Sequence, residues 1–252
     1  MGQGGGVLDP DSVPHSFGLA EDVPTLRSDW HRHRRAQVLY GVEGAMRLHT
    51  EQHVALLPPS RAAFLPAGTR HHVTCRRPVR LRTVYLDPRD DDVPFSVFAA
   101  SPLLASLLVE LAELGPDRPE EAEPLFASVR YLVRQAAGAP LPLRLAVPSS
   151  PGLRDLAERV LARPAAPWAV ADAAQASGLS VRTLQRRFRS ELGIGFRRWL
   201  GLARLHHAVD LLADPALEVG DVALRCGYDS PSAFTRAFRE QLGVSPTRWR
   251  GP

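Results

Sequence analysis

Two stretches in the C-terminal part of the chain repeat each other: residues 180–199 have the sequence SVRTLQRRFRSELGIGFRRW, and residues 230–249 have SPSAFTRAFREQLGVSPTRW. A shift of fifty residues aligns apolar, glycine, tryptophan and arginine positions of the two copies. They are Leu184 with Phe234, Arg186 with Arg236, Phe188 with Phe238, Arg189 with Arg239, Leu192 with Leu242, Gly193 with Gly243 and Trp199 with Trp249. Upstream, with a shift of forty-nine, Ala174 matches Ala223 and Gly178 matches Gly227. Each copy therefore predicts a helix, a turn containing glycine and a second helix.

The second helix of each copy has one apolar and one polar face. Leu184 and Phe188 are four residues apart, so they share a face that packs inward. Arginine can bind guanine through two hydrogen bonds and glutamine can bind adenine in the same way, while serine and threonine can contact phosphates. The residues predicted to contact or position DNA are Ser180, Arg182, Thr183, Gln185, Arg186 and Arg189 in the first copy, and Ser230, Ser232, Thr235, Arg236 and Arg239 in the second.

A single continuous helix is predicted between the copies, over residues 196–212. It would hold the two recognition helices at a fixed separation, which must be roughly 34 Å if both enter successive major grooves on one side of the duplex. The charge distribution agrees with a DNA-binding role. Residues 163–252 contain 13 arginines and 8 acidic residues, a net charge of +5, whereas the preceding residues carry −1. A basic surface of this kind favours contact with phosphates, although a solvated basic face would give the same count.

The N-terminal part has a different pattern. Residues 1–23 are interpreted as a flexible leader, and residues 24–137 as a domain of short strands followed by two helices. Leucine stripes on these helices are predicted to pack against the strands, with a dimer seam as the alternative. Residues 138–152 are rich in proline and serine and are interpreted as a linker, and residues 153–252 as the helical domain. The expected fold class is α+β.

Three histidines form the most distinctive pattern of the N-terminal domain. His31 and His33 are two residues apart, so on a strand they point to the same face. With His71 from a neighbouring strand, and with Gln37, they could bind a divalent metal ion such as zinc, iron, manganese or nickel. Two alternatives remain: the histidines could bind an organic effector, or they could be hydrogen-bonded core residues without a ligand.

Composition excludes several other classes of protein. The longest apolar stretch is too short and too interrupted to cross a bilayer, and the N-terminus lacks the features of a secretion signal, so a cytoplasmic location is expected. Cys75 and Cys226 fall in different predicted domains, so a disulfide framework is not expected.

The C-terminal sequence resembles the DNA-binding domain of the AraC/XylS family over nearly its whole length, including Gly227-Tyr228 and the closing Gly243-Val244-Ser245-Pro246. The resemblance implies that Arg182, Gln185 and Arg186 enter one groove, and that Thr235 and Arg236 enter another. The histidine pattern resembles the two motifs of a cupin barrel, common in sensor domains of AraC-type regulators. Gln37 stands where cupins usually have glutamate, and Cys75 where asparagine often occurs.

Three functions are compatible with these features. The preferred one is a sequence-specific transcription regulator, activator or repressor, that is not an enzyme. Its cupin-like domain would sense a small molecule or a metal ion, and its expected partners are double-stranded DNA, RNA polymerase and a second copy of the chain. The alternatives are a metal-dependent cupin enzyme with an accessory DNA-binding domain and a constitutive DNA-binding protein. The first leaves the C-terminal repeat unused, and the second leaves the histidines without a role.

Overall fold

The computed structural model describes residues 8–75, 78–139 and 143–250. The chain divides into an N-terminal unit, Met1–Leu48 with Pro59–Leu141, and a C-terminal unit, His49–Pro58 with Pro142–Pro252. The N-terminal unit contains antiparallel sheets and the C-terminal unit is mostly helical, which confirms the α+β class. Within the described ranges, no helix combines the length and hydropathy needed to span a membrane.

The first sheet of the N-terminal unit has the strand order β1-β8-β3-β6-β9, with antiparallel neighbours. The strands are β1 (Phe17–Val23), β8 (Val79–Leu86), β3 (Ala36–Glu43), β6 (Arg61–Leu65) and β9 (Ser96–Ala99). Gln37 of β3 lies opposite Leu65 on one side and Tyr85 on the other. Because side chains alternate along a strand, Gln37 and Val38 point to opposite faces of the sheet.

Strands β4 (Met46–Thr50), β7 (His71–Cys75) and β2 (Leu26–Arg27) are neighbours in that order in the second sheet. The backbone of His31 also forms an isolated antiparallel bridge with His71, and each N–H donates to the carbonyl of the other residue. This bridge brings the 31–33 segment alongside the start of β7.

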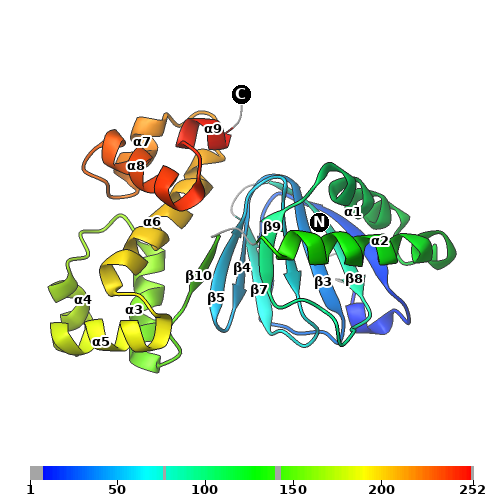
Figure 1. The fold of residues 1–252 in the computed structure, drawn as a ribbon, viewed down its shortest axis with the longest axis horizontal. Coiled ribbons are helices and arrows are strands. Elements are labelled where there is room, and N and C mark those ends of the chain that lie inside the picture. Colours follow the sequence, from blue (N-terminus) through cyan, green and yellow to red (C-terminus); the bar gives the residue numbers. More distant parts are fainter. Residues whose placement is uncertain (1–7, 76–77, 140–142, 251–252) are drawn as a thin grey trace, which may run out of the picture. The chain divides into compact units, whose positions relative to one another are not determined.

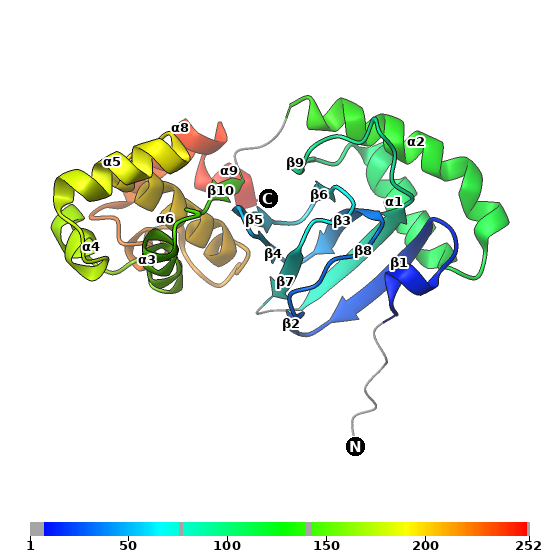
Figure 2. The same ribbon diagram turned by 90° about the horizontal axis from the view of Figure 1, so that it is seen from below.

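Helices α1 (Pro102–Leu114) and α2 (Pro119–Ala137) cover one face of the first sheet (Figure 2). Leu104, Leu108 and Leu111 are fully buried in one core with Val38, Val84 and other strand residues, so these leucines of the predicted stripe belong to the core, whereas Leu103 is exposed. The contact between α1 and β1 is especially close at Gly18, where a Cβ atom would lie 2.1 Å from the carbonyl oxygen of Leu111.

The predicted leader, 1–23, extends too far, because β1 occupies residues 17–23 and a 3-10 turn covers Pro10–Ser12. The sequence FGLAEDV of β1 is short, acidic and contains a glycine, so its alternation gives a weak signal. Its position is fixed by pairing with β8 along its whole length and by an ion pair of 2.8 Å between Asp22 and Arg82. Residues 1–7 of the predicted leader lie outside the described residues.

The helices of the C-terminal unit form two cores joined by a shared helix (Figure 1). They are α3 (Pro151–Ala162), α4 (Val170–Ala176), α5 (Val181–Leu192), α6 (Phe196–Leu212), α7 (Val219–Arg225), α8 (Pro231–Leu242) and α9 (Pro246–Arg250). Helix α6 has the bounds that the sequence predicts. It contributes Phe196 and Trp199 to the first core, and Val209 and Leu212 to the second, so it fixes the separation of the two repeats.

The segment interpreted as a linker, 138–152, contains ordered structure. Strand β10 (Arg144–Ala146) pairs with β5 (His53–Leu57), and both strands belong to the C-terminal unit. The indole N–H of Trp199 donates to the carbonyl of Ala146 at 2.7 Å. Strand β10 has only three residues, so its alternation of apolar and polar side chains is too short to be detected in a segment rich in proline and serine. Residues 140–142, in the middle of this segment, lie outside the described residues.

Candidate nucleic-acid interface and metal centre

The two recognition helices, α5 and α8, begin and end in the same way. The hydroxyl of Ser180 accepts from the N–H of Thr183, and that of Ser230 accepts from the N–H of Ala233, both at 3.2 Å. Both helices end at a glycine in the left-handed region, Gly193 with φ 71° and Gly243 with φ 77°. Local sequence thus sets equal lengths and equal starting points for both helices.

The outward face of α5 carries positive charge. Arg182, Arg186 and Arg189 are exposed, while Leu184 and Phe188 are fully buried on the opposite face. Thr183 is half-buried, and its hydroxyl lies 2.9 Å from that of Ser180. Ser180 and Thr183 therefore hold the first turn of the helix, and the three arginines lie exposed on its outward face.

Gln185 differs from the arginines beside it because it is half-buried against the turn that follows its own helix. A Cβ atom placed on Gly195 would lie 2.9 Å from Oε1 of Gln185. The position of the amide therefore depends on the absence of a side chain at residue 195. The sequence pattern identified Gln185 as a base-contacting residue but contained no signal for this neighbour.

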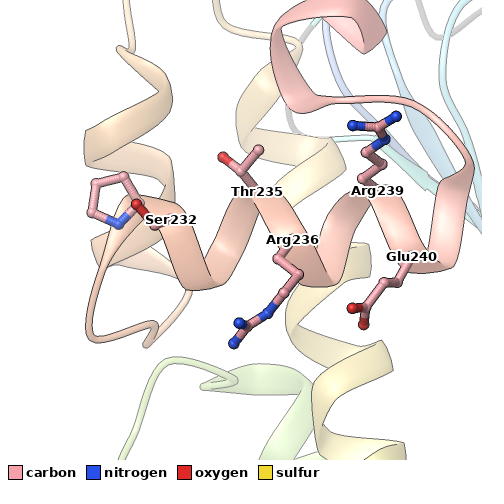
Figure 3. Close-up of a pocket in the computed structure, with 6 residues that line it drawn as sticks. Ser232, Thr235, Arg236, Arg239 and Glu240 are labelled. Carbon is pink, nitrogen blue, oxygen red and sulfur yellow. The ribbon is translucent and has the colours of Figure 1, made fainter.

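The outward face of α8 borders an open groove lined by Pro231, Ser232, Thr235, Arg236, Arg239 and Glu240. Thr235 and Arg239 project along one edge of the helix, and Arg236 and Glu240 along the other (Figure 3). The structure thus brings together Ser232, Thr235, Arg236 and Arg239, as the sequence predicts. Glu240 was missed because an acidic residue gave no signal for contact with a polyanion, yet carboxylates can accept from cytosine.

The three histidines of the N-terminal unit come together. The ligand atoms of His31, His33 and His71 all lie within 4.8 Å of one another. Ring centroids are separated by 4.4 Å between His31 and His71, and by 5.2 Å between His33 and His71. His31 is exposed, whereas His33 and His71 are buried. The predicted cluster therefore exists, with one ligand at the surface and two inside.

Each imidazole is oriented by a backbone carbonyl. Nδ1 of His31 donates to the carbonyl of Asp29 at 2.8 Å, and Nδ1 of His33 donates to that of Arg35 at 2.7 Å. Nδ1 of His71 donates to the carbonyl of Thr69 at 2.8 Å. A neutral imidazole whose Nδ1 carries the hydrogen presents a lone pair at Nε2. This second layer of hydrogen bonds is the usual support for metal-binding histidines.

Burial keeps the inner histidines neutral. It lowers the pKa of His71 to about 4 and also lowers the pKa of His33, so both rings are uncharged at pH 7. In the described part of the chain, the buried Nε2 of His71 has no hydrogen-bond partner. A buried lone pair without a partner is unfavourable, and a cation bound between the three imidazoles would satisfy it, so these residues fit a divalent metal ion.

Gln37 lies beside the cluster and is held there by Tyr85. Oε1 of Gln37 is 3.2 Å from Nε2 of His33, while its Nε2 donates to the hydroxyl of Tyr85 at 3.3 Å. This bond to Tyr85 turns the amide oxygen toward the histidines. Tyr85 was missed in the sequence, although its position opposite Gln37 could have been inferred if the pairing of β3 with β8 had been known. Cys75, at the far end of β7, is not part of the cluster.

Comparison with known proteins identifies both domains of the chain. A model of the AraC-like ligand binding domain matches residues 13–93, and a model of a helix-turn-helix domain matches residues 173–251. The chain belongs to the AraC family of transcription regulators. This AraC-family chain is 28% identical to the HTH-type transcriptional regulator NimR of Escherichia coli over 242 residues, 93% of this chain and 86% of NimR.

The chain is also similar to another regulator and to solved structures. The AraC-family chain is 30% identical to the transcriptional regulator ExsA of Pseudomonas aeruginosa, with 64% of this chain and 59% of ExsA covered. Among solved structures, ToxT from Vibrio cholerae covers 94% of the chain at 12% identity with a TM-score of 0.40. The DNA-binding domain of AdpA, solved with a target DNA, covers 40% at 37% identity with a TM-score of 0.39.

Proposed function

We propose that the protein regulates transcription by binding double-stranded DNA through α5 and α8, in response to a ligand bound in its N-terminal unit. The observation that carries this proposal is the pair of equivalent helices with matched caps and buried faces and with exposed arginines at matched positions, Arg186 with Arg236 and Arg189 with Arg239. A structural pair of helices needs the matched buried face but does not need the matched cationic one. We assign the protein no catalytic reaction, since the named relatives are regulators.

The two helices would recognise different bases. Their inward residues correspond closely, whereas Arg182 and Gln185 on α5 are replaced by Ser232 and Thr235 on α8. The same framework therefore presents different hydrogen-bonding groups to the two half-sites. We expect one chain to bind an asymmetric, directional DNA sequence.

The ligand site would be a metal centre held by His31, His33 and His71, with the amide oxygen of Gln37 as a further donor. Imidazole-rich sites suit zinc, iron and nickel, and manganese accepts mixed nitrogen and oxygen donors. A bound divalent ion would supply positive charge and coordination positions open to an effector. Support comes from the shared Nδ1 hydrogen bonds to backbone carbonyls and from the unpaired Nε2 of buried His71.

We extend the proposal to RNA polymerase and to a second copy of the chain as partners in the cytoplasm, where a bacterial-type regulator meets its promoter. Two exposed apolar side chains on α1 and α2 support a homodimer. Leu103 is 60% exposed and Tyr131 is 56% exposed, although the other leucine, valine and phenylalanine side chains of these helices are buried or half-buried.

The test is DNA binding by full-length Arg186→Ala and Arg236→Ala proteins, measured by fluorescence anisotropy on the duplex upstream of the protein's own gene across a salt series. Loss of a bidentate base contact should cost about 1–3 kcal/mol, and loss of a phosphate contact should reduce the salt slope by about 1. Arg187→Ala, an exposed arginine of α5 that flanks the predicted contact face, is the control and should bind as the wild type does. Unchanged affinity of both variants at every salt concentration would contradict the proposal.

A further inference from the structure

We infer that the effector of the metal centre is an anionic oxygen ligand, such as a small carboxylate, that binds the metal directly. This inference rests on the metal centre proposed above. It starts from the chemistry of the donors: three imidazoles and one amide oxygen, all of them neutral. Within the described residues, no carboxylate or thiolate joins the cluster.

A neutral donor set leaves both positive charges of a divalent ion uncompensated. Charge is costly in a partly buried site, where the effective dielectric constant is far below that of water. His33 is only 5% exposed and His71 is fully buried, so bulk water does not surround the centre. An anion that completes the coordination would neutralise part of this charge, whereas an uncharged ligand of the same shape would not.

Two carboxylates that interact electrostatically with these residues lie outside the cluster. Asp11 interacts electrostatically with His33, but its oxygens accept from the backbone N–H of Arg34 at 2.9 and 3.1 Å. Glu21 interacts electrostatically with Tyr85 and not with a histidine of the cluster. Neither carboxylate is a member of the histidine cluster.

The same residues provide access and a hydrogen-bond donor. His31 is exposed, so a small ligand can approach the centre from its side. The hydroxyl of Tyr85 accepts from Gln37 and therefore keeps its own hydrogen to donate. The hydroxyl lies 3.3 Å from the amide nitrogen of Gln37, and the ring packs edge-on against His33, so we expect this donor to bind an anion's second oxygen.

The experiment uses full-length protein loaded with cobalt(II), whose visible absorption responds to changes in its ligands. Acetate is compared with acetamide, which has the same shape and no charge. We expect acetate to change the spectrum in a saturable way and acetamide to leave it unchanged at equal concentration. In Gln37→Glu, the introduced carboxylate should retain cobalt but weaken acetate binding by about tenfold or more, since it already supplies negative charge.

Gln135→Glu, which adds the same charge at an exposed position of α2, is the matched control and should bind acetate as the wild type does. Tyr85→Phe is the second variant, and it should retain cobalt while binding acetate more weakly. Equal spectral responses to acetate and acetamide, or unchanged acetate binding by cobalt-loaded Gln37→Glu, would overturn the inference and leave the metal centre intact. Absence of bound cobalt in the wild type would overturn the metal centre itself and, with it, this inference.

Discussion

Oε1 of Glu191 accepts a 2.7 Å hydrogen bond from the hydroxyl of Ser150, and Oε2 accepts from the backbone N–H groups of Ser149 and Ser150 at 2.9 and 3.1 Å. Ser150 is the residue that precedes α3, yet its own side chain does not cap that helix. The carboxylate of Glu191, in α5, serves the start of α3 instead, where negative charge is favourable. A recognition helix is thereby fixed to the segment that enters the C-terminal unit.

Glu191→Gln should destabilise the C-terminal unit, by about 1 kcal/mol at pH 7, because a neutral amide cannot replace the charge-assisted hydrogen bonds. Burial alone would raise the pKa of Glu191, but the bonds from Ser150 and Ser149 outweigh it and lower the pKa below 4.5. The stabilisation is therefore complete above pH 4.5 and is lost as the pH falls through the lowered value. Thermal melting of both proteins between pH 7 and pH 3 measures this effect.

The difference between the two melting temperatures should narrow as the pH falls. Glu158→Gln, at an exposed position of α3, removes the same charge and should change the melting temperature little at any pH. A constant difference between wild type and Glu191→Gln down to pH 3 would refute the assigned role of the carboxylate.

Gly195→Ala should alter DNA recognition with little loss of stability. The backbone of Gly195 has φ −79°, which alanine adopts readily, but the new methyl group would meet Oε1 of Gln185 at 2.9 Å. The flexible amide would move, and discrimination at the base that it contacts should fall. Competition binding with single-base variants of the duplex measures this change. Gly201→Ala, where a Cβ atom meets nothing within 4 Å, should leave the sequence preference as it is.

Gly18→Ala should disrupt the N-terminal unit. The added Cβ atom would lie 2.1 Å from the backbone oxygen of Leu111, and backbone on both sides leaves no flexible group to move aside. We expect a loss of about 3 kcal/mol or more in the free energy of unfolding, measured by chemical denaturation. Gly152→Ala, at an open position at the start of α3, should have a small effect, and an equal effect of the two substitutions would contradict the packing described for α1 on β1.

His71→Ala should abolish metal binding. Its buried Nε2 has a lone pair without a hydrogen-bond partner, so it is available as a metal ligand. The two remaining imidazoles would bind a divalent ion far more weakly. Metal content is measured by elemental analysis after zinc loading and desalting, with circular dichroism to verify folding. His72→Ala is the neighbouring control: its ring packs against Trp30 at 4.4 Å, and it should retain zinc. Equal zinc in both variants would remove His71 from the centre.

The helical domain could be predicted from the sequence because its determinants are local. These determinants act within one or two helical turns: the caps at Ser180 and Ser230, apolar residues four apart, and glycines at the helix ends. Because the sequence is repeated, each of these patterns occurs twice. The sequence predicts the histidine cluster by placing His31 and His33, two residues apart, on one strand. In the structure His31 forms an isolated bridge and His33 precedes β3, so the cluster forms although the strand assignment for this segment is wrong. The sequence also predicts that a neighbouring strand brings His71 to this pair, and β7 does so through its bridge with His31.

The remaining features depend on tertiary contacts. Strand β1 is defined by its pairing with β8, and β10 by its pairing with β5, and neither sequence is strongly apolar or regular by itself. The partnership of Gln37 with Tyr85 requires the register of β3 against β8. Similarly, the dependence of Gln185 on Gly195 arises where a helix meets the following turn.

The bridge between His31 and His71 joins parts of the chain that are distant in sequence, with residues 34–70 forming the segment between the metal-binding positions. A metal ion held by His33 and His71 would close this segment into a loop and act as a reversible cross-link. Such a link restricts the unfolded chain as well as ordering the folded one. The thermal stability of the N-terminal unit would then depend on the availability of the metal ion or effector, before any change at the DNA.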